Sequence, residues 1–128
     1  VLASTPQAVR VGRHLLAAAG HGATGEPPEQ WPGPFVVVAN GSAKRSDKAP
    51  GHFDPRAAEF DADLVARLQT GELAGLDLAL AGELWADVEA LAQLDGLVEI
   101  DPDSVETGLI SDPYGVLYVV VTGRGSRR

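Results

Sequence analysis

The residues best suited to chemistry lie in one loop, which runs from Asn40 to Phe53 directly after an apolar run. Lys48 lies in it, and it opens with seven residues that we expect to bind a ligand: Asn40, Gly41, Ser42, Ala43, Lys44, Arg45 and Ser46. Cations, hydroxyl groups and free backbone N–H groups together bind carboxylates and phosphates. The loop therefore predicts a pocket for a small anionic ligand or for an acidic partner segment.

A second interpretation of the same loop is purely structural. Its glycine and lysine spacing differs from that of a phosphate-binding P-loop. Its cations are equally able to pair with Asp47, with Asp54 or with acidic helices while the loop stays in solvent. The sequence leaves both interpretations open.

The histidines give one candidate for proton transfer. His52 lies inside the loop, and an imidazole titrates near neutral pH, so His52 is the candidate acid/base group. His14 and His21 lie about 10 Å apart along a helix, too far for direct chelation of one metal ion. The chain has no cysteine, which removes thiolate metal sites and cysteine nucleophiles. No metal site of its own is predicted.

Hydrolase motifs are missing from the chain. Ser42 is followed by Ala and Lys, so it lacks the Gly-x-Ser-x-Gly elbow of a serine hydrolase. The alternating pairs Asp61/Asp63 and Asp101/Asp103 look like solvated charges rather than the catalytic carboxylates of a glycosidase. Neither hydrolase class is indicated.

Composition limits the remaining classes. A chain of 128 residues suits a single domain, and its net charge of −8 disfavours nucleic acid as a partner. No apolar run approaches the length of a membrane helix, so we expect no membrane insertion. The lack of cysteine favours a cytoplasmic setting. Because the chain starts at Val1 and contains no Met, we also expect that sequence precedes it.

The elements that must position the loop follow from apolar spacing. We expect an N-terminal helix within residues 1–20, running from Pro6 to residue 19 with Ala8, Val11 and Leu15 on its buried side. Residues 21–34 are rich in Pro and Gly and predict a loop that Trp31 pins to the core. Residues 35–39 predict a strand covered on both faces.

After the loop, Asp54 and Pro55 predict the start of a helix with a buried stripe at Ala57, Phe60, Leu64 and Leu68. A further helix is expected over residues 79–95 with Trp85 on its buried face.

Residues 107–110 and 116–122 predict a hairpin, and the second of these strands is apolar enough to be central in a sheet. Residues 97–100 suit a short strand or a helix end, and residues 124–128 a disordered tail. The fold class is therefore α/β, a mixed sheet layered with helices, in one domain over residues 1–123.

Two longer motifs carry a family resemblance. Residues 49–61 read Ala-Pro-Gly-His-Phe-Asp-Pro-Arg-Ala-Ala-Glu-Phe-Asp, and residues 113–118 read Pro-Tyr-Gly-Val-Leu-Tyr before a closing strand. With the Gly-Ser-Ala-Lys-Arg-Ser turn at residues 41–46, residues 35–123 resemble the C-terminal half of class III extradiol ring-cleavage dioxygenases, in an actinobacterial branch.

The resemblance implies an active site with one residue changed. In active relatives a histidine near this turn acts as acid/base beside an Fe(II) ion, and the N-terminal half supplies two His and one Glu to hold the iron. Aligned on that motif, Ala43 takes the place of the histidine, and a methyl group transfers no proton. The iron ligands have no counterpart in this chain.

Three functions follow as expectations. The first is a non-catalytic or diverged dioxygenase-like protein that keeps a ligand or protein-interaction pocket at residues 40–53. It would pair with another copy, as a homo-oligomer, or with a missing N-terminal half, because a half-fold exposes apolar faces. The second is an Fe(II)-dependent ring-cleavage enzyme whose iron ligands lie outside this chain, with His52 as substitute acid/base. The third is a regulatory module that binds a small anion.

Overall fold

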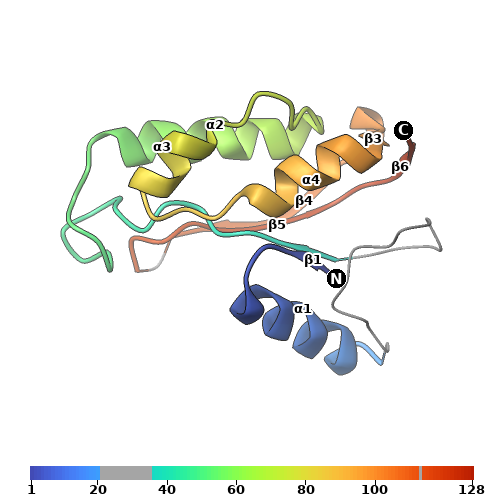
Figure 1. The fold of residues 1–128 in the computed structure, drawn as a ribbon, viewed down its shortest axis with the longest axis horizontal. Helices are drawn as coiled ribbons and strands as arrows, with labels where there is room; N and C mark the ends of the chain where they lie inside the picture. The colour runs from blue at the N-terminus through green and yellow to red at the C-terminus, as the bar shows by residue number, and fades with distance from the viewer. Residues whose placement is uncertain (21–35, 113) are drawn as a thin grey trace.

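A computed structural model of the chain describes residues 1–20, 36–112 and 114–128. This part is a mixed α/β structure with four α-helices and three two-stranded sheets, one parallel and two antiparallel (Figure 1). The mixed α/β prediction is confirmed at that level. The predicted loop over residues 21–34 and the placement of Trp31 lie outside the described residues.

The N-terminal unit is a parallel strand pair between two helices. β1 (Leu2–Ala3) pairs with β2 (Val37–Val38), and the pair contacts α1 (Pro6–Ala18) on one side and α4 (Glu89–Leu97) on the other (Figure 1). Both residues of β2 are partly covered. The strand expected over residues 35–39 therefore exists in a shorter form, and β1 is its partner.

The start of α1 follows the sequence prediction, but its buried face does not. The Thr5 hydroxyl accepts a hydrogen bond from the Ala8 N–H at 3.1 Å, and Pro6 occupies the first turn. Ala8 and Gly12 are buried, whereas Val11 and Leu15 are exposed.

The close approach at Gly12 explains the exposure of Val11. A Cβ at Gly12 would lie only 2.6 Å from a methyl group of Val1, so the helix packs most tightly on its glycine face. Packing on that face turns Val11 toward solvent. Leu15 lies seven residues after Ala8, on the same side of the helix, and is still 54% exposed.

Three helices cover the opposite face of the strand layer. α2 (Arg56–Thr70) begins just after Asp54, whose carboxylate accepts the Arg56 N–H at 2.9 Å, and ends at Gly71 with a left-handed φ of 74°. α3 (Leu78–Glu83) and α4 follow. Apolar side chains of these helices and of the segments between them form the main core: Ala57, Phe60, Leu64, Leu73, Ala81, Leu84, Val88 and Leu91. The predicted stripe of α2 is therefore largely buried.

The prediction of a single helix over residues 79–95 is wrong, because the helix is interrupted between α3 and α4. Trp85 has a left-handed φ of 57°, and the backbones of Asn40 and Asp87 form an antiparallel bridge. The Ala43 N–H also donates to the Leu84 carbonyl at 3.0 Å. These bonds replace helical ones, and Trp85, expected on the buried face, is 58% exposed.

The C-terminal part contains the predicted hairpin. β4 (Glu106–Ser111) pairs with β5 (Tyr118–Thr122), with an irregular register between Thr107 and Leu109. β5 is not covered on both faces as expected, since Tyr118 and Val120 are about half exposed. In the described part, β4 is the one partner of β5.

The last residues form an ordered strand pair. The chain passes through a short 3₁₀ turn, η1 (Pro102–Ser104), ahead of the hairpin. β3 (Val98–Ile100) pairs antiparallel with β6 (Gly125–Arg127), beside the C-terminus in Figure 1. The segment expected to be a disordered tail is therefore paired. No helix in the described residues is long and apolar enough to span a bilayer.

Candidate functional site

The start of the 40–53 loop is anchored to α2 by one buried carboxylate. The Ser42 N–H donates to Asp61 Oδ1 at 2.8 Å, and the Ser42 hydroxyl donates to Asp61 Oδ2 at 2.7 Å. Both residues are fully buried. A Cβ at Gly41 would lie 3.2 Å from Asp61 Oδ1 and 3.1 Å from the Leu117 Cβ, so glycine permits this close approach. Asp61 thus fixes the loop where it leaves the strand layer.

Asp61 also orients the arginine that follows. Arg45 Nη1 lies 3.5 Å from Asp61 Oδ2, and Arg45 Nη2 lies 3.2 Å from Asp112 Oδ2. The expectation that Asp61 is a solvated helix charge is wrong. Asp61 is four residues after Ala57 and three before Leu64, on the buried stripe, and that spacing is the signal that identifies it.

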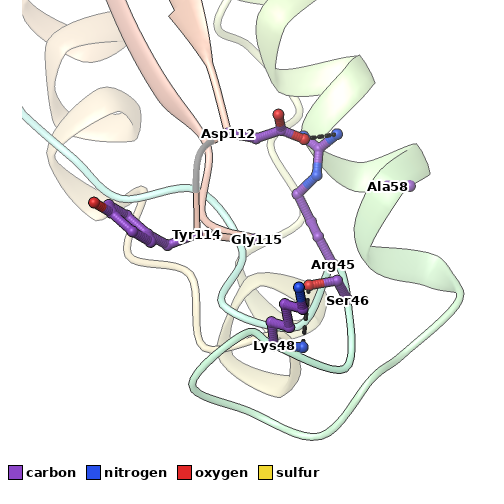
Figure 2. A pocket seen from close by; sticks show the side chains of 7 residues that line it. All are labelled: Arg45, Ser46, Lys48, Ala58, Asp112, Tyr114 and Gly115. Carbon is purple, nitrogen blue, oxygen red and sulfur yellow. Dashed lines mark hydrogen bonds and ion pairs between the residues drawn. The ribbon is translucent and has the colours of Figure 1, made fainter.

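A cavity of about 370 Å³ opens beside Arg45. Its lining comes from the loop, from α2 and from the turn between β4 and β5: Arg45, Ser46, Lys48, Ala58, Asp112, Tyr114 and Gly115. Figure 2 shows the Arg45 side chain reaching from the loop to Asp112, with Ser46 and Lys48 below it and the Tyr114 ring pointing away from them. The lining residues thus carry two cations, one carboxylate and two hydroxyl groups, those of Ser46 and Tyr114.

The hairpin turn meets the loop at close range. Gly115 has a left-handed φ of 70°, and a Cβ there would lie 2.5 Å from the Ser46 hydroxyl oxygen. The Ser46 hydroxyl in turn accepts a long hydrogen bond from the Lys48 N–H at 3.3 Å. Glycine at position 115 therefore lets the turn close one side of the cavity.

The seven residues expected to bind a ligand have separate roles. Arg45 and Ser46 line the cavity. Gly41 and Ser42 are buried against Asp61, and the exposed Asn40 bridges to Asp87 through its backbone.

The middle of the loop is held from outside the cavity. The Ala43 N–H donates to the Leu84 carbonyl, and the Ala43 carbonyl accepts a hydrogen bond from the Gly51 N–H at 2.8 Å. Lys44 Nζ lies 5.2 Å from the centre of the Trp85 ring, an arrangement in which a cation is attracted to an aromatic face. Backbone N–H groups early in the loop are therefore occupied by the fold.

His52, the candidate acid/base group, is exposed and is not among the residues that line the cavity. The described residues contain no group of three His, Asp or Glu side chains arranged to hold a metal ion.

A second arginine cluster lies at the start of α2. Arg56 binds Asp54 Oδ2 at 2.9 Å and Glu83 Oε2 at 3.0 Å. The hydrogen bonds from the Arg56 side chain and backbone lower the pKa of Asp54 from 3.8 to about 2. Hydrogen bonds to Asp54 and Glu83 raise the pKa of Arg56 above its ordinary value. This cluster is exposed and lines no part of the cavity.

Sequence reasoning missed the half of the cavity that the hairpin supplies. Asp112, Tyr114 and Gly115 have the composition of a turn, and no local pattern indicates that this turn folds against the 40–53 loop.

No family model matches the chain, and neither the curated proteins nor the solved structures include a significant match.

Proposed function

We propose that this chain is a small-anion-binding module whose site is the cavity between the 40–53 loop and the turn of the β4–β5 hairpin. The observation that carries the proposal is Arg45 in the cavity wall, where it is held from behind by the buried Asp61. An arginine fixed in this way presents its remaining N–H groups without first losing side-chain freedom.

The surrounding groups favour an anion that carries two or more oxygens. Lys48 forms no ion pair within the described residues and lies on the cavity wall. The Ser46 hydroxyl is the neutral donor beside it. A cavity of about 370 Å³ accommodates a small organic acid or a phosphate ester rather than a polymer. The proposed ligands are therefore small carboxylates and phosphates.

The wider proposal is a cytoplasmic, non-catalytic or diverged relative of the class III extradiol dioxygenases. It is supported by the motifs at residues 41–46, 49–61 and 113–118 and by Ala43 at the position of the acid/base histidine. The methyl group of Ala43 has no proton to exchange. The alternative of an Fe(II)-dependent ring-cleaving enzyme, with His52 as acid/base, stays a prediction that no described contact favours.

Isothermal titration calorimetry with sodium phosphate and sodium benzoate tests anion binding. Lys48→Ala removes a cavity cation and is expected to lower the affinity about tenfold, the effect of losing one charge-assisted contact. Lys44→Ala is the matched control, because it removes the same charge from the same loop outside the cavity lining. Equal losses in the two variants would show that only net charge matters and would reject the pocket.

The proposal includes a second copy of the chain as partner. Leu109 lies opposite Val120 in the hairpin, and with Tyr118 they form an apolar strip that is about half exposed. Among the described strands, β4 and β5 pair only with each other, and we propose that this strip packs against the same strip of a second copy about a two-fold axis.

Light scattering during size exclusion measures the assembly. The chain is expected to elute at twice its monomer mass, and Val120→Lys is expected to elute as a monomer. The exposed Ala66→Lys change on α2 adds the same charge away from the strip and should leave the dimer intact. A wild-type monomer at high concentration would contradict the pairing.

A further inference from the structure

We propose that Asp112 is a built-in competitor for the anion site, occupying the edge of Arg45 that a ligand must use. This inference rests on the proposed function. It adds that the empty site is closed by the chain's own carboxylate and that a ligand binds by displacing it.

The two carboxylates on Arg45 differ in their freedom to leave. Asp61 is 0% exposed and accepts two further hydrogen bonds from Ser42, so its position is fixed from several sides. Asp112 is 57% exposed and reaches Arg45 through a single contact of 3.2 Å. Only the Asp112 contact is free to exchange with solvent or ligand.

The geometry of Arg45 sets the chemistry of the displacing ligand. Nη1 points to Asp61, and Nη2 points to Asp112 in the cavity wall. A carboxylate or phosphate that replaces Asp112 brings an oxygen to Nη2 and keeps a second oxygen for Lys48 or for the Ser46 hydroxyl. The ligand is therefore an oxyanion with at least two oxygens, and Asp112 imitates one half of it.

Exchange is favoured because the contact that breaks is weak. Ion pairs with an exposed partner change an equilibrium by up to about fivefold. A ligand that contacts Arg45 and Lys48 together replaces one weak pair by two interactions. Asp112 thus sets a threshold concentration for binding without closing the site permanently.

The displaced carboxylate also links binding to the hairpin. Asp112 follows β4 at the start of the turn, and Tyr114 and Gly115 in the same turn also line the cavity. When the ligand takes Nη2, the turn loses its ion pair to the loop. Occupancy of the cavity is therefore expected to loosen this tether between the hairpin and the 40–53 loop.

Calorimetry with sodium phosphate and sodium benzoate tests the competitor with two variants of the full chain. Asp112→Asn keeps the size of the side chain and removes its charge, and it is expected to raise the affinity for both anions about two- to fivefold. Asp47→Asn is the matched control. It removes one charge from an exposed residue of the 40–53 loop that forms no ion pair in the described part, and less than about a 1.5-fold change is expected.

The outcomes separate this inference from the proposed function. Tighter binding by Asp112→Asn alone supports the competitor. Binding by the wild type that Asp112→Asn weakens or leaves unchanged overturns the competitor while the anion site stands. Equal gains in both variants show a general charge effect and also overturn it. If neither the wild type nor Asp112→Asn binds either anion, the proposed function fails, and the competitor fails with it.

Discussion

Two arginines in this chain each lie between two carboxylates, and the surroundings of the pairs differ. Arg45 lies between Asp61 and Asp112, and its side chain is 25% exposed. Arg56 lies between Asp54 and Glu83 with 53% exposure. Only the first cluster contains a carboxylate with no access to solvent. That one buried partner fixes Arg45 against a cavity, whereas Arg56 is part of the solvated surface at a helix start.

The comparison shows that a list of charges does not define a site. Both arginines lie within residues 45–56, and each has two acidic partners, one of which is distant in the sequence. In the first, the backbone and hydroxyl of Ser42 give both oxygens of the buried Asp61 a hydrogen-bond partner. In the second, water is available to every partner, and the ion pairs contribute little.

The largest effect on stability is expected from removal of the buried carboxylate of Asp61. Asp61→Ala leaves the Ser42 N–H and hydroxyl unpaired and removes one partner of Arg45, so the unfolding free energy is expected to fall by about 3–5 kcal/mol. Urea denaturation followed by circular dichroism measures this loss.

Asp63→Ala serves as the control for that measurement. Asp63 is two residues away on the same helix and forms an exposed ion pair with Arg67 at 2.7 Å. Its loss is expected to cost less than about 1 kcal/mol. Similar losses for the two aspartates would contradict the assignment of Asp61 as the anchor of the loop.

The smallest effect is expected in the exposed cluster, where it appears as pH dependence. The folded pKa of Asp54 is about 2, below its ordinary value of 3.8. A depressed carboxyl pKa stabilises the fold above pH 3.8, and this contribution is lost as the pH falls through about 2. Arg56→Gln removes the main cause, so the pKa of Asp54 is expected to return toward 3.8.

Carbon-detected NMR titration of the Asp54 carboxyl group measures that change. The exposed Arg10→Gln variant on α1 removes an equal charge and should leave the titration where it is. If the pKa of Asp54 stays near 2 in the Arg56→Gln variant, groups other than the Arg56 side chain lower it.

Local signals in the sequence predicted the elements that local interactions form. Pro6 marked the start of α1, and Asp54 with Pro55 marked the start of α2. The hairpin was visible in two apolar runs around a turn. Each of these depends on residues within a few positions of one another.

The features that local patterns did not indicate depend on distant partners. The break at Trp85 depends on backbone bonds to Asn40 and Ala43, some forty residues earlier in the chain. The spacing of Asp61 places it on the buried stripe of α2, but its partner Ser42 lies 19 residues earlier, and no local pattern indicates that pairing. The cavity depends on Asp112 meeting Arg45, and no pattern around either residue encodes that contact.

The left-handed turn at Trp85 has an experimental use. It holds an exposed indole ring with the Lys44 ammonium group 5.2 Å from its centre, directly beside Arg45 in the chain. Indole emission responds to a nearby charge, so a movement of the loop that shifts Lys44 changes the fluorescence of Trp85. With Trp31 replaced by Phe, the chain carries a single tryptophan as its optical reporter, and the state of the loop can be followed without a label.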